Sequence, residues 1–148
     1  MTTFKSIVID DIEILVAMML DFYAIDNYPI NPEISKKLFQ EFISNENLGK
    51  AWLIISQNEI VGYIILTFVF SFEYQGKIAF LDELYLSEEA RGKGIGKETI
   101  RFIQSESSKL GLKLIYLELE PYNENAEKLY LASGFKNHNR KLLKHKTN

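Results

Sequence analysis

The chain contains no cysteine, and its longest apolar run, residues 60–70, is short. The absence of cysteine excludes disulfides, thiolate metal sites and a cysteine nucleophile, and it fits a reducing compartment. A run of this length cannot span a bilayer. The first residues also lack the apolar stretch and cleavage site of a signal peptide. We therefore expect a soluble, cytoplasmic protein without a membrane partner.

Neither sign of charge dominates, with 17 basic residues against 20 acidic ones and a net charge of −3. Without an excess of positive charge, the composition does not favour nucleic acid as a partner. Both histidines, His138 and His145, lie in the basic C-terminal stretch without a carboxylate at ligand spacing. We therefore expect no metal site and no Ser-His-Asp triad.

Apolar residues are plentiful: 47% of the chain is hydrophobic and 13% aromatic. A chain of 148 residues can bury roughly 68–70% of its unfolded surface. No linker, repeat or low-complexity segment interrupts it. We expect one domain covering residues 1–148.

Periodicity and turn residues predict an α/β (α+β) fold. Helices are expected from a start near Asp10 to a break at Asn27, over residues 32–43, from a glycine turn to residue 110, and over 123–134. Strands are expected at 4–9, 51–56, 60–71, 78–86 and 113–120, the second and third forming a hairpin. The strand, helix and strand between residues 78 and 120 predict a parallel pair with a right-handed crossover.

Four rings recur at period two after the hairpin, which predicts that one strand face carries them all: Phe68, Phe70, Phe72 and Tyr74. They either pack between sheet and helix, or the last two line a substrate groove with Glu73 and Gln75 at its rim. Tyr23 and Tyr28 lie beside the break after the first helix and are the aromatic residues there least expected to serve in packing alone. Tyr28 is a further candidate for contact with a substrate.

Residues 81–96, LDELYLSEEARGKGIG, carry the strongest functional signal. Asp82 and Glu83 are adjacent carboxylates near a strand end, where a core position is not expected. After them, alternating glycines leave backbone N–H groups free to point at one object at a helix start, which suits an anion such as a diphosphate. Neither the Walker A loop nor the dinucleotide fingerprint fits these residues.

The turn does fit the pattern Q/R-x-x-G-x-G/A, through Arg91, Gly92, Lys93, Gly94, Ile95 and Gly96. A second ordered set, N-x-x-A-x-x-x-Y-x-x-x-G-F, runs from Asn123 to Phe135. Together the two motifs resemble the acetyl-CoA-binding segments of the GNAT family of N-acetyltransferases. The resemblance implies a mixed, mostly antiparallel sheet with flanking helices, in which a parallel strand pair splays around acetyl-CoA.

The same resemblance implies the cofactor site. Acetyl-CoA is the expected co-substrate, and no metal is expected. The glycine turn would hold its diphosphate, with charge added by Lys93 and Lys97. The amides of Leu84 and Leu86 would hold the thioester carbonyl and pantetheine, Tyr85 lies between them, and Asn123 would bond to the pantetheine arm. The cofactor set is therefore Leu84, Tyr85, Leu86, Arg91, Gly92, Lys93, Gly94, Ile95, Gly96, Lys97 and Asn123.

The expected reaction moves an acetyl group to an amine, which needs a base and a proton for the departing thiolate. Tyr130 is the general acid that the resemblance implies, and Asp82 or Glu83 is the base. Successive strand residues face opposite ways, so only one of the two should face the cleft unless a bulge intervenes. The resemblance implies such a bulge at this point of the strand, so alternation does not choose between the two carboxylates. The adjacent acids resemble those of spermidine/spermine N-acetyltransferases, which suggests a polyamine-like small-molecule acceptor near Tyr28, Phe72 and Glu73.

Two other functions are compatible with these residues. Acetylation of a protein lysine or N-terminus would need an open peptide groove, and a non-catalytic acyl-CoA sensor would keep the turn without turnover. The presence of both Tyr130 and the acidic pair disfavours the sensor. A homodimer is compatible with the resemblance.

Overall fold

The computed structural model describes residues 1–148 and divides into two compact units, Met1–Glu118 and Leu119–Asn148. The first unit holds a five-stranded sheet in the order β1-β2-β3-β4-β5. Its strands are β1 (Thr2–Ser6), β2 (Gly49–Ser56), β3 (Glu59–Ser71), β4 (Gly76–Leu86) and β5 (Ile115–Tyr116). The pairs β1–β2, β2–β3 and β3–β4 are antiparallel, and the pair β4–β5 is parallel. The expected mixed, mostly antiparallel sheet is confirmed.

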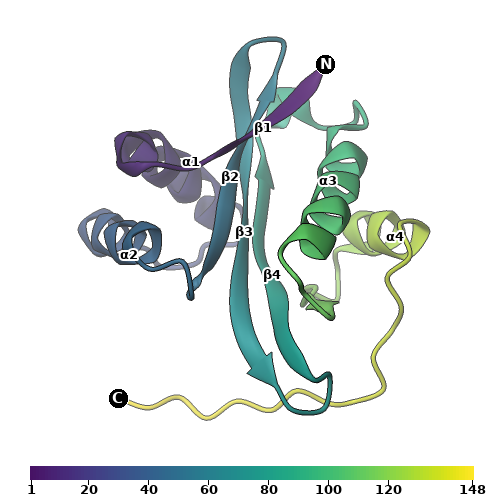
Figure 1. The fold of residues 1–148 in the computed structure, drawn as a ribbon. Helices are drawn as coiled ribbons and strands as arrows, with labels where there is room; N and C mark the ends of the chain where they lie inside the picture. The colour runs from purple at the N-terminus through teal and green to yellow at the C-terminus, as the bar shows by residue number, and fades with distance from the viewer. The chain divides into compact units, whose positions relative to one another are not determined.

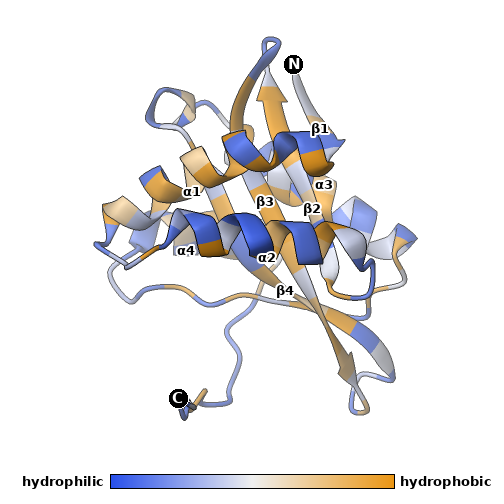
Figure 2. Ribbon diagram, turned by 90° about the vertical axis from the view of Figure 1, so that its left-hand side faces the viewer, coloured by the Kyte–Doolittle hydropathy of each residue, from blue (hydrophilic) through white to orange (hydrophobic).

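Three helices cover the two faces of this sheet (Figure 1). Helices α1 (Ile12–Ile25) and α2 (Pro32–Ser44) lie on one face, and α3 (Ile95–Lys109) lies on the other. Short 3-10 turns at Ile9–Asp11 and Glu88–Ala90 precede α1 and α3. Figure 2 shows α2 with a largely hydrophilic surface in front of hydrophobic strands.

Local sequence explains where α1 and α2 form. Buried residues of α1 fall at helical spacing, so one stripe faces the sheet: Ile12, Leu15, Val16 and Met19. Helix α2 starts at Asn31, whose side chain accepts hydrogen bonds from the amides of Glu33 and Ile34 at 3.0 and 3.3 Å. Pro32 occupies its first turn, where a missing N–H costs nothing.

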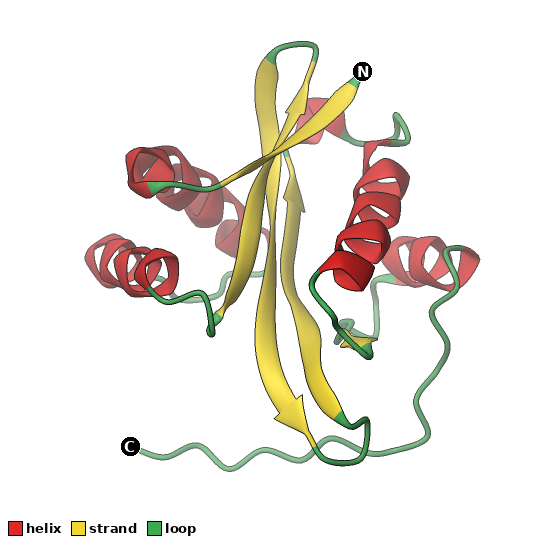
Figure 3. Cartoon of the chain, viewed as in Figure 1, coloured by secondary structure: helices red, strands yellow, loops and turns green.

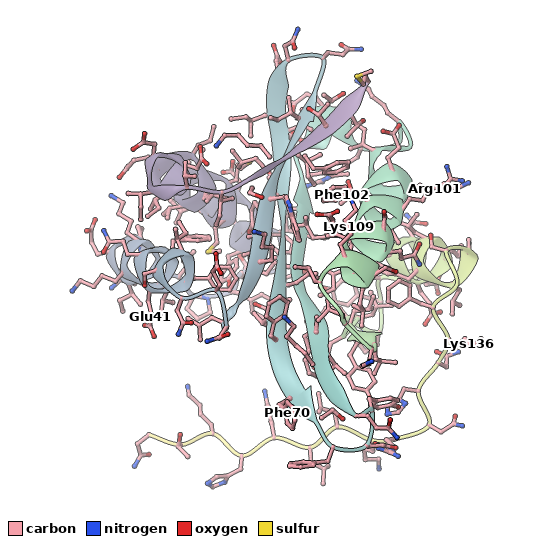
Figure 4. All side chains as sticks on the ribbon, in the orientation of Figure 1. Glu41, Phe70, Arg101, Phe102, Lys109 and Lys136 are labelled. Carbon is pink, nitrogen blue, oxygen red and sulfur yellow. The ribbon has the colours of Figure 1, made fainter.

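Each face of the sheet has its own packed cluster. Towards α1 and α2, Leu53, Tyr63 and Tyr85 pack with the buried residues of α1. Towards α3, Ile54, Ala90 and Ile95 form a second cluster with Leu84 and Leu86 against it. The ring of Phe102 on α3 stacks on Phe4 at 4.1 Å and meets Trp52 edge-on, so its side chain turns to the sheet (Figure 4).

The β3–β4 hairpin continues past the helices that cover the sheet (Figure 3). The expected strand face with four rings is wrong beyond Ser71, because the chain turns there. Ser71 Oγ accepts a hydrogen bond from the Tyr74 amide at 3.1 Å, and Gln75 takes a left-handed φ of 62°. Phe70, near the end of the hairpin, and Phe72 in the turn are 70% and 90% exposed, so they do not pack between sheet and helix (Figure 4).

Two strands differ most from their expected ranges. β1 covers Thr2–Ser6 rather than residues 4–9, because its pairing with β2 runs from Thr2 opposite Ser56 to Ser6 opposite Trp52. β5 contains only Ile115 and Tyr116 instead of residues 113–120, because its ladder with β4 includes only Ala79 and Phe80. The parallel pairing therefore stops where the functional part of β4 begins.

The second unit contains α4 (Glu124–Ala132), the helix that the second motif predicts. Asn123 caps it, and its Oδ1 accepts a hydrogen bond from the Ala126 amide at 3.2 Å. At the other end Gly134 takes a φ of 99°, and the Phe135 amide donates to the Tyr130 carbonyl at 3.1 Å. No helix in the structure is long and apolar enough to cross a membrane.

Candidate active site

A β-bulge brings the two adjacent carboxylates to the same cavity. Ile65 of β3 lies opposite Glu83, while the next residue, Leu66, lies opposite Leu81. Asp82 is therefore the extra residue of β4, and the strict alternation of side chains is broken at this point. Both Asp82 and Glu83 line a cavity of about 220 Å³ between the sheet and the helices α1 and α2.

The cavity is a mostly apolar chamber with an acidic end. Its apolar wall comes from Met19 on α1, Leu38, Phe39 and Phe42 on α2, and Ile65 on β3. Its other polar groups are the hydroxyls of Tyr23, Ser35 and Thr67, and no lysine, arginine or histidine lines it. Such a chamber suits an alkyl chain that ends in a positively charged group.

Glu83 is held by two phenols from different elements. The Tyr23 hydroxyl on α1 donates to Oε2 at 2.6 Å, and the Tyr63 hydroxyl on β3 donates to Oε1 at 2.7 Å. Burial is the largest effect on the pKa of Glu83 and raises it. The two phenol hydrogen bonds lower the pKa, and the charge of Asp82 raises it by a smaller amount. Burial and the Glu83 charge raise the pKa of both phenols, so both remain protonated donors at neutral pH.

Asp82 is exposed at the cavity and makes no hydrogen bond with another side chain. The surrounding protein still raises the pKa of its carboxyl by partial burial. A carboxylate with a raised pKa holds a proton more strongly, which makes it a better base at neutral pH. Its exposure also gives an accepted proton a route to solvent.

The glycine turn presents an open backbone. Gly92 and Gly94 take left-handed φ angles of 73° and 82°, and a Cβ built on either would meet no atom within 4 Å. The Arg91 side chain turns back to the strand, where its Nε donates to the Leu86 carbonyl at 3.0 Å. No side chain caps α3, and its first backbone bond runs from the Glu98 amide to the Gly94 carbonyl at 3.1 Å. The intervening amides are therefore free to bind a diphosphate.

One buried apolar side chain of the turn packs in the core and fixes the position of the turn. Ile95 is 5% exposed and packs with Ile54 and Ala90, while Lys93 and Lys97 on either side are exposed. This packing fixes the backbone of the turn and leaves the space beside Gly92 and Gly94 open. The residues predicted to bind the diphosphate are thus together, and the space they surround is not filled by side chains of the turn.

The strand segment between the bulge and the turn also offers unpaired main-chain groups. Because the Leu86 carbonyl accepts a hydrogen bond from Arg91, the polar groups of Leu86 point away from β3. Alternation along an antiparallel ladder gives Leu84 the same direction. β5 pairs only with Ala79 and Phe80, so it leaves these groups without a strand partner. Tyr85 packs instead in the core against Phe22, with ring centroids 5.6 Å apart.

In the second unit Tyr130 is 7% exposed, and its ring contacts that of Phe135 edge-on at 5.4 Å. Burial raises the pKa of its phenol to about 12. The group is therefore protonated at physiological pH and able to donate. Each unit of raised pKa makes complete transfer of that proton harder by about 1.36 kcal/mol.

The residues predicted to contact the acceptor lie elsewhere. Tyr28 follows α1, while Phe72 and Glu73 lie in the turn between β3 and β4, and none of the three lines the carboxylate cavity. Sequence reasoning missed Tyr63, which is fully buried and bonded to Glu83. The β3–β4 register would have indicated it, since Tyr63 is two residues from the partner of Glu83 and on the same face.

Comparison with known families identifies the class of protein. The sequence profile of the Acetyltransferase (GNAT) family matches residues 16–135. The chain belongs to the GNAT acetyltransferase family. The open backbone of the glycine turn fits the diphosphate of acetyl-CoA. No cluster of three or more potential metal ligands occurs in the structure.

Two relatives of known activity are similar over part of the chain. The D-amino-acid N-acetyltransferase HPA3 of Saccharomyces cerevisiae is 28% identical over 110 residues, which are 71% of this chain and 66% of that protein. The thialysine N-epsilon-acetyltransferase of Bos taurus is 31% identical over 75 residues, 51% of this chain and 44% of that protein. The chain thus spans less than two thirds of either relative.

Solved structures show the same fold over nearly the whole chain. An integron cassette protein, HFX_CASS3, from the mobile metagenome of Cole Harbour Salt Marsh has a TM-score of 0.88 at 29% identity, covering 98% of this chain and 90% of its own. A predicted acetyltransferase from Clostridium acetobutylicum, solved with acetyl-CoA, has a TM-score of 0.81 at 17% identity, covering 98% and 96%.

Proposed function

We propose that this acetyltransferase transfers the acetyl group of acetyl-CoA directly to the primary amine of a small, polyamine-like molecule. The observation that carries the proposal is the apolar cavity that ends in Asp82 and Glu83 at the bulge of β4. An alkyl ammonium group matches both parts of this cavity, since its chain can contact the apolar wall and its charge can pair with the carboxylates.

The chemistry starts from an amine that is mostly protonated. With a pKa of about 10.4, roughly one amine in two thousand is neutral at pH 7, a cost of about 4–5 kcal/mol. A carboxylate of the acidic pair takes one proton, and the freed nitrogen attacks the thioester carbonyl carbon. The amides of Leu84 and Leu86 stabilise the oxygen of that carbonyl as negative charge develops on it.

Collapse of the adduct breaks the carbon–sulfur bond and leaves the CoA thiolate. The nitrogen loses its second proton in this step, and Tyr130 donates a proton to the sulfur and is then reprotonated. Ammonium and thioester thus give amide, thiol and one proton. The raised pKa of Tyr130 keeps its proton available until the thiolate forms.

The charge of the cavity favours a diamine over an amino acid. The carboxylate of an amino acid would approach two carboxylates without a lysine, arginine or histidine in the cavity lining to pair with it. A second amine on the acceptor suffers no such repulsion. The bovine relative is named for the N-epsilon amine of thialysine, which lies at the far end of that amino acid's side chain from its carboxylate.

A panel of acceptors tests the proposal, with CoA thiol release followed by a chromogenic disulfide and the acetylated product identified by mass. Diamines should react best, monoamines less, and D-amino acids and lysine peptides least. Preference for a lysine peptide would show a protein acetyltransferase. If acetyl-CoA binds but no amine or peptide causes thiol release, the chain is an acyl-CoA sensor and the proposal is wrong.

A further inference from the structure

The two carboxylates of the bulge differ in their hydrogen bonds. Each oxygen of Glu83 accepts a hydrogen bond from a phenol, at 2.6 Å from Tyr23 and 2.7 Å from Tyr63. Asp82 has no such bond and faces both the cavity and solvent. Two carboxylates that are neighbours in sequence and line one cavity are thus prepared for different tasks.

We propose that Tyr23 and Tyr63 are positioning residues that fix Glu83 as the anion that binds the acceptor's ammonium group, leaving Asp82 to take its proton. This inference rests on the proposed function and assigns separate roles to the acidic pair. The proton leaves the ammonium nitrogen for an Asp82 oxygen, gives a neutral carboxyl and a neutral amine, and then passes to solvent.

The packing around the phenols supports the fixed position of Glu83. Tyr63 is fully buried, and its ring lies against those of Phe22 and Tyr85, with centroids 6.4 and 5.8 Å away. It cannot swing aside to free its oxygen of Glu83. Tyr23 is half-buried and reaches the other oxygen from α1, so the carboxylate is held from two sides.

No other charged group competes for Glu83 in the cavity. The titratable side chains that face Glu83 are Tyr23 of α1, Tyr63 of β3 and Asp82 of β4. Helix α2 contributes only Ser35 and apolar side chains to the lining. Since no basic residue neutralises the pair, a cationic acceptor is the natural counter-ion, and it can bond to Glu83 through lone pairs that the phenols leave free.

Kinetics with a diamine separate the two roles. Asp82→Asn should lower kcat by about 100-fold or more, the range for loss of a general base, with little change in the KM of the diamine. Glu83→Gln should mainly raise that KM, by about tenfold, as expected for loss of one charge-assisted hydrogen bond. An equal loss of kcat in both variants, or a larger loss in Glu83→Gln, would overturn the assignment.

The pH profile tests the phenols themselves. Tyr23→Phe removes one hydrogen bond that lowers the pKa of Glu83. In a plot of diamine affinity against pH, the fall in affinity on the acidic side should therefore move to higher pH in this variant. The same shift should appear in Tyr63→Phe. Tyr74→Phe is the matched control, because Tyr74 is also half-buried and accepts a phenol hydrogen bond from Tyr116, outside this cavity. Equal profiles in all three variants would refute a positioning role.

Titration of the labelled side-chain carboxyls by carbon NMR gives a readout that needs no turnover. The Glu83 carboxyl should titrate at higher pH in Tyr23→Phe than in the wild type and unchanged in Tyr74→Phe. Absence of turnover with every amine would overturn the proposed function, and this titration would still decide for or against the phenol clamp. An unchanged Glu83 titration in Tyr23→Phe would overturn the clamp even in an active enzyme.

Discussion

Replacing Gly94 by alanine should remove most of the stabilisation that acetyl-CoA gives to the protein. Gly94 is the N-cap residue of α3 and has a φ of 82°, and a Cβ there would meet no protein atom within 4 Å. An alanine in this left-handed conformation costs about 1–2 kcal/mol. For a chain of this length that corresponds to a fall in Tm of about 2–8 °C without ligand.

Gly111 provides a matched control at the other end of the same helix. Its φ is 72°, and a Cβ there would also meet nothing within 4 Å. Its amide donates to the Ser108 carbonyl and the Leu112 amide to the Ser107 carbonyl, at 3.2 and 2.9 Å, which is a Schellman end far along the helix from the turn. Gly111→Ala should therefore lose a similar amount of stability through the backbone alone.

The two variants should separate when acetyl-CoA is added. A ligand at one hundred times its Kd stabilises the folded state by about 2.7 kcal/mol, or roughly 5–11 °C in Tm for a chain of this size. Wild type and Gly111→Ala should show this rise. In Gly94→Ala the methyl group occupies the space of the diphosphate, so the rise should fall by more than half. Thermal scans of the three proteins with and without acetyl-CoA measure it, and equal rises in both variants would refute the assignment of the turn.

Three further variants test other parts of the account. Tyr130→Phe should lower kcat by about 10²–10³-fold, the scale of general acid catalysis, and leave the Kd of acetyl-CoA, measured by calorimetry, nearly unchanged. An unchanged kcat would remove the phenol from the mechanism. Asn31→Ala should cost about 1 kcal/mol of stability through loss of the cap on α2, and Asn31→Ser should restore it in chemical denaturation; equal stability of both would contradict the capping role. Asp82→Asn should raise Tm at neutral pH, because the raised pKa of Asp82 means that its ionised form opposes folding. The carboxyl of Asp82 is a stronger acid in the unfolded chain than in the folded protein. The Tm gain of Asp82→Asn should therefore disappear as the pH falls through the pKa of Asp82 in the folded protein. A Tm difference that persists at acid pH would contradict this explanation.

The sequence predicted the elements whose signals are local. The cap at Asn31 and the glycines at 92 and 94 each specify a backbone conformation by themselves, and the structure has both features. Strand ends were predicted less well, because a strand ends where its partner ends. β5 shows this most clearly, since its apolar residues continue past the two that pair with β4.

The site was predictable in composition but not in arrangement. Asp82 and Glu83 were identified from their types and place, but which way each faces depends on a bulge that the family resemblance implies and local patterns do not encode. The bonds of Glu83 to Tyr23 and Tyr63 join residues 60 and 20 positions apart, so they depend on strand register and helix packing. The expected cytoplasmic location and homodimer stay predictions.

The most direct test of acetyl transfer to an amine held at the acidic pair follows thiol and protein mass in one sample. The protein is mixed with excess acetyl-CoA, with or without a diamine, while released CoA thiol is counted and the intact protein is weighed by mass spectrometry. The account predicts thiol release only when the diamine is present, one thiol for each acetylated amine, and an unmodified protein. Acetylated protein formed without the amine, or no thiol release with it, would contradict the account.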